Sequence, residues 1–223
     1  DDGGFAYSSS ILSAAKECVE NGADIISMSL GGPLPNVFEI FGFRQLLKDN
    51  GVISVAAAGN GGNGMWSFPA SYPGVVSVAA LDEDRKIAPF SQFNRQVDIA
   101  APGVDVMSTF PMKAPCLICE SKEEYGYGTI SGTSMATPHV AGVLALLKSF
   151  KPTATPEELI DAMEKSAEDL GRDGKDKKFG HGLVQALAAA ELLNGGALAE
   201  SFSQQPDKSS DCSNEEMMFD LKM

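Results

Sequence analysis

The fold is decided by the stretch Gly128-Thr-Ile-Ser-Gly-Thr-Ser134-Met-Ala-Thr-Pro-His139-Val-Ala-Gly142, where a serine in a glycine-rich segment precedes a strongly apolar run. From Ser134 to about Ser149 apolar residues cover every face, which is the pattern of a helix buried on all sides. Pro138 is best tolerated in the first turn of such a helix, because its missing N–H would have no partner there anyway. We therefore expect the helix to begin near Ser134 or Met135, with the Ser134 hydroxyl at its N-terminus.

A serine at this place has two interpretations. The unpaired N–H groups and positive dipole of a helix N-terminus would stabilise the oxyanion formed when Ser134 takes part in acyl transfer. Serine is also an ordinary helix N-cap, and the residues alone favour neither interpretation. A third motif is excluded, because the nucleophile elbow Gly-x-Ser-x-Gly would need glycine where the chain has Ala136.

Composition suits one globular α/β domain. The 223 residues are 43% hydrophobic and 21% charged, and no apolar run approaches the roughly eighteen residues that cross a membrane. The net charge of −13 repels phosphate backbones, which argues against nucleic acid as a partner. The chain begins at Asp1-Asp-Gly-Gly4 without an initiator Met or a signal sequence, as expected of a fragment or a mature product.

The four cysteines are too scattered for a disulfide scaffold or a tetrahedral zinc site. Cys116 and Cys119 are interpreted as loop residues that are either free thiols or a local disulfide. Redox chemistry is the weaker alternative, because no strand-helix context surrounds them. Cys18 lies on the apolar stripe of a predicted helix, so we expect it in the core.

Alternating helix and strand patterns in the first half of the chain predict a parallel sheet with helices on both faces. Amphipathic helices are expected over residues 11–21 and 38–50, each followed by a glycine. Short apolar strands are expected at residues 24–30, 52–58, 75–80 and 97–101. The sequence therefore indicates an α/β fold in three layers.

The second half adds helices and a polar tail. Thr155-Pro-Glu-Glu158 is a capping box with proline at the first helical position, which predicts a helix that ends at Gly171. Another helix is expected over roughly 183–193. We divide the chain into a domain at 1–194 and an acidic, weakly ordered tail at 195–223, because the tail has few core residues.

Several phrases of the chain, in order, resemble landmarks of the subtilisin-like serine proteases. The three longest are Met28-Ser-Leu-Gly-Gly32, Ala56-Ala-Ala-Gly-Asn60 and Gly132-Thr-Ser-Met-Ala-Thr-Pro-His-Val-Ala-Gly142. Ala101-Pro-Gly103 and Gly180-His-Gly-Leu183 agree with them, so the resemblance covers roughly residues 4–193. It implies a serine endopeptidase, and it implies that this chain is the C-terminal part of the catalytic domain, incomplete at the N-terminus.

The resemblance implies roles for individual residues. Ser134 matches the nucleophile and Asn60 matches the side-chain donor of the oxyanion hole, whose second donor is the N–H of Ser134. Without the resemblance, an asparagine between glycines is more often a turn residue. The residues Ser29-Leu30-Gly31 would pair with the main chain of an extended substrate, and Gly4-Phe-Ala6 would lie on its other side.

A side-chain pocket and a weak cation site are also implied. Ala57, Gly59 and Ser67 would wall the first pocket, and their lack of charge predicts a preference for uncharged, fairly large apolar residues before the cut. Phe68-Pro69 matches a turn whose X-Pro bond is cis in the family. The residues that resemble a weak cation site are Ala70, Tyr72, Val75 and Asp98. We expect a structural Ca²⁺ or monovalent ion there at most, and no catalytic metal.

No histidine in the chain suits the role of general base. His139 lies about 140° around the helix from Ser134, at roughly 100° per residue, so its ring is not expected to reach the hydroxyl. His181 falls at a family position that is not catalytic. The family phrases Asp-Thr/Ser-Gly and His-Gly-Thr do not occur, and Asp1-Asp-Gly3 is too close to the first helix. We therefore expect the catalytic Asp and His upstream of this chain, and the chain alone to be inactive.

Two functions of different classes follow. The first is a serine endopeptidase whose substrates are extended polypeptides, with a propeptide or an inhibitor as further partners. The second is a non-catalytic module that binds extended peptides along Ser29-Leu30-Gly31. An upstream sequence that lacks both missing phrases would favour the module. By family analogy, the location is secreted or endomembrane.

Overall fold

The computed structural model describes residues 7–109 and 126–195, and within them a four-stranded parallel sheet runs in the order β1-β2-β3-β4. The strands are β1 (Ile25–Met28), β2 (Ile53–Ala57), β3 (Val75–Leu81) and β4 (Ile99–Pro102). Every residue of the central strands β2 and β3 is buried. Burial on both faces explains why these strands are continuous apolar runs rather than alternating ones.

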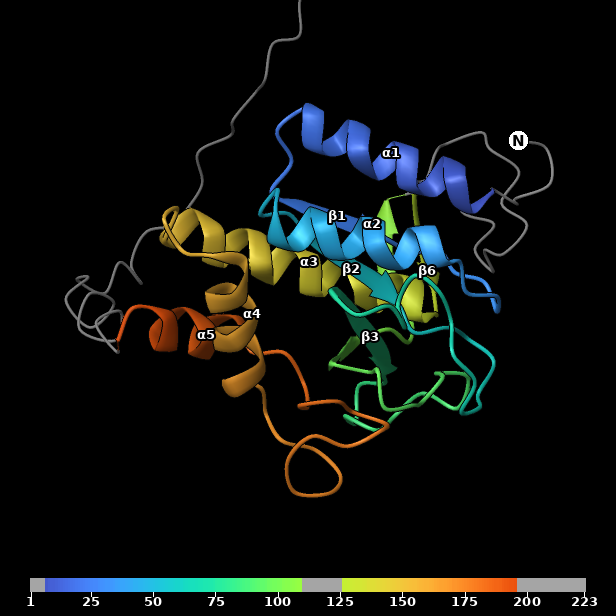
Figure 1. Ribbon diagram of the computed structural model, residues 1–223. Coiled ribbons are helices and arrows are strands. Elements are labelled where there is room, and N and C mark those ends of the chain that lie inside the picture. Colours follow the sequence, from blue (N-terminus) through green and yellow to red (C-terminus); the bar gives the residue numbers. More distant parts are fainter. Residues whose placement is uncertain (1–6, 110–125, 196–223) are drawn as a thin grey trace, which may run out of the picture.

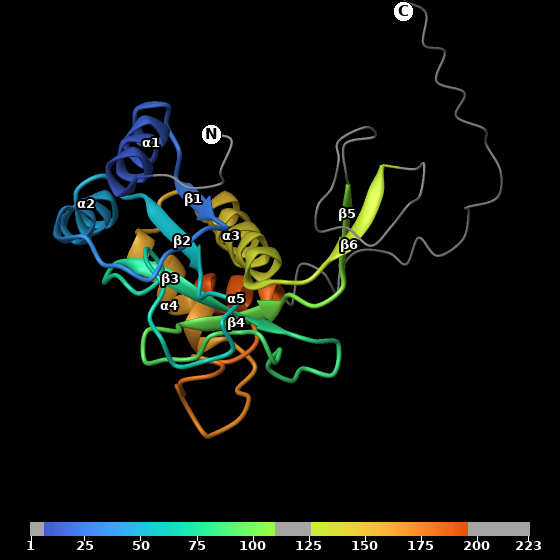
Figure 2. The same cartoon turned by 90° about the vertical axis from the view of Figure 1, so that its right-hand side faces the viewer.

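Helices cover both faces of the sheet, as the sequence predicts (Figure 1). In the described part, α1 (Ser8–Glu20) and α2 (Val37–Lys48) lie on one face. The other face is covered by α3 (Thr133–Phe150), α4 (Pro156–Lys165) and α5 (Ala186–Leu193) (Figure 2). The α/β fold in three layers is therefore confirmed.

The helix α3 contacts all four strands, and this packing fixes the place of Ser134. Its side chains Val140, Leu144 and Leu147 are fully buried against the sheet. Each such side chain contributes about 1.5–3 kcal/mol when it is removed from water. The hydrophobic core thus anchors the helix that carries the serine.

The prediction that Ser134 lies at the N-terminus of α3 is confirmed, but the place of Pro138 and the extent of burial differ from the prediction. The helix begins at Thr133 with Gly132 as its N-cap residue, so Pro138 lies in the second turn rather than the first. Ser134 is accordingly not an N-cap. The expected burial on all sides is also wrong, because the side of α3 turned away from the sheet is exposed, with Leu146 at 41%.

Smaller differences concern the ends of elements and one cysteine. The capping box of α4 is present as predicted, but the helix ends at Lys165 instead of Gly171. The last helix begins late because Leu183 exchanges two main-chain hydrogen bonds with Glu168. Cys18 is exposed, not part of the core, because α1 turns Ala15 toward the interior.

Two short strands were not expected from the sequence. The strands β5 (Val106–Thr109) and β6 (Tyr127–Ile130) pair antiparallel and project from the body of the molecule, and β6 leads into α3 (Figure 2). Their residues do not alternate between apolar and polar, which is why no strand pattern is visible.

Several predictions concern residues that the structure does not describe, among them Gly4-Phe-Ala6, Cys116, Cys119 and the tail beyond Gly195. The division into a domain and a tail therefore stays a prediction. Among the residues that are described, no helix combines the length and the apolar character needed to cross a membrane.

Candidate active site

Ser134 is the second residue of α3, and the turn before it is held by the segment after β4. The N–H of Gly132 donates to the carbonyl of Gly103 at 2.7 Å. A Cβ at Gly103 would lie 2.6 Å from the Cβ of Ala80 and 2.8 Å from the carbonyl oxygen of Gly132. Glycine is therefore needed here for the close approach of the two segments, which explains the Ala101-Pro-Gly103 phrase.

Asn60 is fixed to the start of the same helix. Its Oδ1 accepts hydrogen bonds from the main-chain N–H of Thr133 at 2.9 Å and from the Thr133 hydroxyl at 2.8 Å. Because an N–H can only donate, the oxygen of the carboxamide must face Thr133. The NH₂ group of Asn60 is thus left as a donor, and the side chain is held by the residue adjacent to Ser134.

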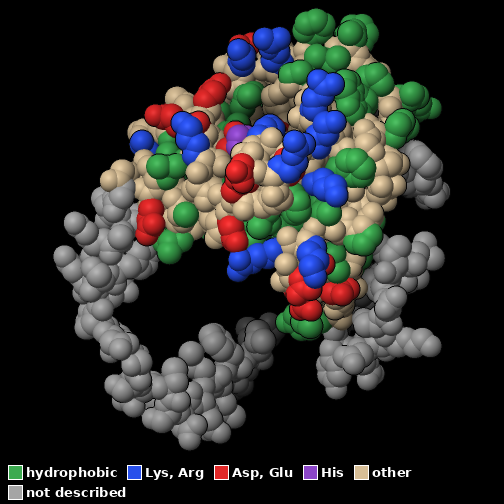
Figure 3. Space-filling model, turned by 90° about the horizontal axis from the view of Figure 1, so that it is seen from below, with side chains coloured by type: hydrophobic (Ala, Val, Ile, Leu, Met, Phe, Trp, Pro, Cys, Tyr) green, Lys and Arg blue, Asp and Glu red, His purple; other side chains and the backbone are tan. Residues whose placement is uncertain are grey.

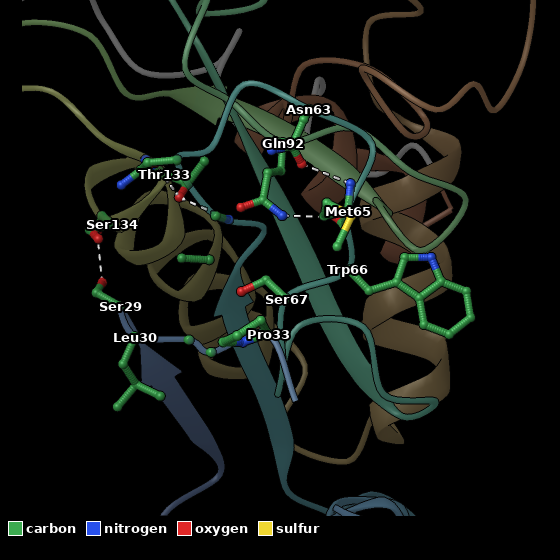
Figure 4. Close-up of a pocket in the computed structure, with 15 residues that line it drawn as sticks. Ser29, Leu30, Pro33, Asn63, Met65, Trp66, Ser67, Gln92, Thr133 and Ser134 are labelled. Carbon is green, nitrogen blue, oxygen red and sulfur yellow. Dashed lines mark hydrogen bonds between the residues drawn. The ribbon is translucent and has the colours of Figure 1, made fainter. Parts of the chain in front are cut away.

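A cavity of about 450 Å³ brings the predicted site residues together, and we call it the Ser134 cavity (Figure 4). Its lining includes the predicted catalytic residues and the predicted substrate-binding residues that the structure describes: Ser134, Asn60, Ser29, Leu30, Gly31, Ala57, Gly59 and Ser67. Among the described residues that line it, none carries a formal charge. The fold therefore brings residues from segments far apart in the chain together around one cavity.

The two walls of the cavity meet at a short main-chain bridge. Gly32 and Phe68 exchange two hydrogen bonds, at 2.9 and 2.8 Å. The peptide bond between Phe68 and Pro69 is cis, as the resemblance implied. On the inner side of the bridge, the Ser67 hydroxyl lies so close to Gly31 that a Cβ there would collide with it. A side chain at position 31 would therefore require the Ser67 hydroxyl to move.

Sequence reasoning missed residues that support or border the site. Gln92 accepts from the N–H of Gly61 at 3.3 Å and donates to the carbonyl of Met65 at 2.8 Å, so it holds the loop that follows Asn60. Met65 and Trp66 are 63% and 54% exposed and line the cavity. Thr133 could have been found as part of the Gly-Thr-Ser phrase. The segment around Gln92 carries no pattern that would single it out.

Neither histidine lines the Ser134 cavity. His139 lies on the exposed side of α3, and its Nδ1 is 2.8 Å from the carbonyl of Met135. It faces a different pocket, bordered by β5. His181 lies in the loop between α4 and α5, where its Nε2 is 3.4 Å from a carboxylate oxygen of Glu164.

His181 belongs to a group of titratable residues that we call the Glu164 cluster: Asp98, Glu164, Lys175 and His181. Burial, followed by the charge of Asp98, raises the pKa of Glu164 to about 7. Burial, followed by the charge of Lys175, lowers the pKa of His181. Both shifts favour the neutral form of their group, so they work against an ion pair at the 3.4 Å contact.

Two of the four proposed cation ligands, Asp98 and Tyr72, already have protein partners. One carboxylate oxygen of Asp98 accepts from the N–H of Ser77 at 2.9 Å, and the other lies 2.7 Å from Nζ of Lys175. The Tyr72 carbonyl accepts from the N–H of Val75 at 3.2 Å. A metal ion at Asp98 would have to displace the ammonium group, so these residues fit a metal poorly. No set of three or more His, Cys, Asp or Glu suited to a metal occurs in the described ranges.

Comparisons with known proteins agree with the fold and with the sequence motifs that resemble subtilisin-like proteases. The profile of the Subtilase family matches residues 1–182. The Minor extracellular protease Epr of Bacillus subtilis (strain 168) is 37% identical over 85% of this chain and 28% of its own length. Subtilisin Savinase of Lederbergia lenta is 36% identical over 81% of this chain and 61% of its own length.

Solved structures give the same answer. The psychrophilic subtilisin-like protease Apa1 of Pseudoalteromonas sp. AS-11 superimposes with a TM-score of 0.78 at 24% identity, covering 87% of this chain and 76% of its own. The prenylagaramide maturation protease PagA gives a TM-score of 0.73 at 30% identity, covering 86% and 69%. The fold is that of subtilisin-like proteases. The chain belongs to the subtilase family, and it spans less than two thirds of the length of the two curated relatives named above.

Proposed function

We propose that the protein is a serine endopeptidase in which Ser134 is the nucleophile and Asn60 stabilises the oxyanion. The observation that carries the proposal is the pair of hydrogen bonds from Thr133 to Asn60 Oδ1, because they occupy the carboxamide oxygen and leave the NH₂ group as the donor of a side chain that lines the cavity with Ser134. Attack of the hydroxyl on a peptide carbonyl forms a tetrahedral oxyanion, and its collapse releases the amine and leaves an acyl-enzyme. Water then hydrolyses the ester.

The general base and the residue that orients it come from a segment N-terminal to this chain. A serine hydroxyl is a weak nucleophile at neutral pH, and it needs a histidine that a carboxylate orients. Neither His139 nor His181 lines the cavity with Ser134. We therefore assign this chain to the C-terminal part of the catalytic domain, and we expect the chain alone to hold the nucleophile and oxyanion hole without protease-like turnover.

The substrates are extended polypeptides that pair with the main chain of Ser29-Leu30-Gly31. The uncharged lining, with Met65 and Trp66 among its residues, favours a large apolar side chain before the cut. A propeptide or an inhibitor would occupy the same segment as a substrate does. Since Epr carries the name of an extracellular protease, we place this protein outside the cell or in an endomembrane compartment.

A structural Ca²⁺ or monovalent ion at Ala70, Tyr72, Val75 and Asp98 stays a proposal for stability alone. It requires Lys175 to release the Asp98 carboxylate, which makes binding weak. A rise in melting temperature on adding Ca²⁺, reversed by a chelator, would support it. No step of the reaction depends on this ion.

Cleavage of a peptide library by the upstream-extended protein tests the proposed function. We expect cuts after large apolar residues, loss of all cuts in Ser134→Ala, and unchanged cutting in the control Ser149→Ala. Ser149 lies exposed in the last turn of the same helix, where its hydroxyl donates to the carbonyl of Leu146. A preference for Lys or Arg before the cut would contradict the assigned pocket.

The alternative is a module that binds extended peptides without cutting them. The observation in its favour is that the described part of the Ser134 cavity contains no general base. Tight binding of library peptides by the upstream-extended protein, together with their complete survival, would support this alternative and refute the protease.

A further inference from the structure

The carbonyl of Ser134 lacks its regular helical partner. In an α-helix, the carbonyl of one residue accepts from the N–H four residues later, and for Ser134 that residue is Pro138. Proline has no N–H, so its place in the second turn leaves the Ser134 carbonyl without an intrahelical donor of this kind. The missing helical hydrogen bond is therefore that of the residue that we propose as the nucleophile.

The side chain of Ser29 supplies the missing hydrogen-bond donor. The hydroxyl of Ser29 donates to the Ser134 carbonyl at 2.7 Å, and Figure 4 shows the two residues joined in this way. Ser29 immediately follows β1, and it belongs to the segment expected to pair with the substrate. One short hydrogen bond thus connects the substrate-binding wall with the main chain of the nucleophile.

The start of α3 is consequently held from two strands. The N–H of Thr133 is bonded to Asn60, which follows β2, and the carbonyl of Ser134 is bonded to Ser29, which follows β1. The strands β1 and β2 are parallel neighbours, so their carboxyl ends meet at the same edge of the sheet. The main chain is thereby fixed on both sides of the Ser134 Cα.

We propose that Ser29 is a positioning residue for the nucleophile. Its hydroxyl takes the place of the helical donor that Pro138 cannot supply, and it fixes the Ser134 peptide so that the N–H and the hydroxyl of Ser134 keep their directions in the cavity. The proposal rests on the proposed function, because it gives Ser29 a role in the reaction of Ser134. A purely structural bond between β1 and α3 would give stability without any effect on that reaction.

A double-mutant cycle tests the proposal, because the chain offers a second way to supply the same donor. In Pro138→Ala, the new N–H of residue 138 can bond to the Ser134 carbonyl within the helix. The cycle comprises the upstream-extended protein, Ser29→Ala, Pro138→Ala and the double variant. Its readouts are the rate of labelling by a fluorophosphonate, kcat and KM for a peptide substrate, and the denaturant midpoint. Ser29→Thr keeps the hydroxyl, and Ser149→Ala is the control.

We expect Ser29→Ala to reduce the labelling rate and kcat roughly two- to tenfold, the range for one neutral hydrogen bond, with a smaller change in KM. Adding Pro138→Ala should restore most of the labelling rate, and Ser29→Thr, which keeps the hydroxyl, should be labelled faster than Ser29→Ala. The coupling between the two positions is the signature of a shared acceptor.

Two results would overturn the proposal in distinguishable ways. If Ser29→Ala lowers the denaturant midpoint but is labelled as fast as the parent, or if Pro138→Ala rescues nothing, Ser29 has no positioning role. If the parent itself is never labelled, the proposed function fails, and the positioning role fails with it. In that second case, a coupled shift of the denaturant midpoint would still identify the shared hydrogen bond as a structural one.

Discussion

The Ser134 cavity lies at the carboxyl ends of the parallel strands, and the Glu164 cluster lies at their amino ends. The two sites also consist of different kinds of side chain. Ser29 and Asn60 follow the carboxyl ends of β1 and β2, whereas Asp98 precedes β4. The described lining of the cavity is uncharged and held by hydrogen bonds between neutral groups. The cluster consists of groups that titrate. In an open parallel sheet, ligands bind at the carboxyl edge, which agrees with the place of the cavity.

This difference separates the effects of pH on geometry and on stability. The hydrogen bonds that orient Asn60 and Ser134 involve no group that titrates near neutrality, so the oxyanion hole should keep its shape from mildly acid to mildly alkaline pH. On the face seen in Figure 3, by contrast, positive and negative side chains are intermixed around a histidine. Stability should respond to pH through the Glu164 cluster, and activity through the general base proposed outside this chain.

The largest effect among the supporting residues is expected for Thr133→Val in a catalytically complete protein. Thr133 is fully buried, and its hydroxyl donates to Asn60 Oδ1 and accepts from the N–H of Gly59 at 3.3 Å. Valine keeps the shape and the main-chain bond but removes both of these contacts. We expect kcat to fall about tenfold, with KM nearly unchanged, because one neutral hydrogen bond contributes about 0.5–1.5 kcal/mol.

The matched control for this change is Thr137→Val. Thr137 is equally buried one turn later, and its hydroxyl donates to the carbonyl of Thr133 at 2.8 Å without touching Asn60. Both variants should lose stability, but Thr133→Val should lose far more kcat. Equal kcat values for the two variants would contradict the orienting role of Thr133.

A smaller effect is expected for Glu164→Gln, measured as the free energy of unfolding against pH. Folding raises the pKa of Glu164 from 4.5 to about 7, so the folded state binds its proton more tightly than the unfolded state. The stabilising contribution is complete below about pH 4.5 and is lost as pH rises through about 7. Glutamine does not titrate, so the variant should lack this loss, on the order of 1 kcal/mol after solvent screening.

His181 acts in the opposite direction and must be measured beside Glu164. Its pKa is lowered in the folded state, so its contribution to stability is complete above its ordinary value of 6.5 and is lost as pH falls through the lowered folded value. The charges that act on the pair belong to Asp98, Lys175, Asp161 and Asp169. A wild-type curve that does not fall relative to Glu164→Gln between pH 4.5 and 7 would contradict the raised pKa.

The sequence predicted the sheet and the cavity well because both depend on local patterns. Continuous apolar runs mark β2 and β3, and the phrases around Ser29, Asn60 and Ser134 lie at the ends of strands or at the start of a helix. Parallel pairing then brings those ends together without further information. The roles of the three residues in catalysis stay a proposal.

What the sequence did not reveal depends on contacts between distant segments. The place of Pro138 in the second turn of α3 was not predicted, because its tolerance there depends on a remote hydroxyl, that of Ser29, which donates to the Ser134 carbonyl. Gln92, which holds the loop after Asn60 by two hydrogen bonds, lies in a segment that has no recognisable sequence pattern. Cys18 was misjudged because helical periodicity does not define where the edge of an apolar stripe meets solvent.

Active-site labelling with a fluorophosphonate tests the central claim most directly. Three proteins are compared: this chain, the chain extended upstream through its proposed Asp and His, and the extended protein with Ser134→Ala. In subtilisin, a member of this family, loss of the histidine alone costs roughly 10⁶ in turnover, about as much as loss of the whole triad. We therefore predict labelling of the extended protein alone, at Ser134. Strong labelling of the short chain at Ser134, or persistent labelling of the Ser134→Ala variant, would contradict the account.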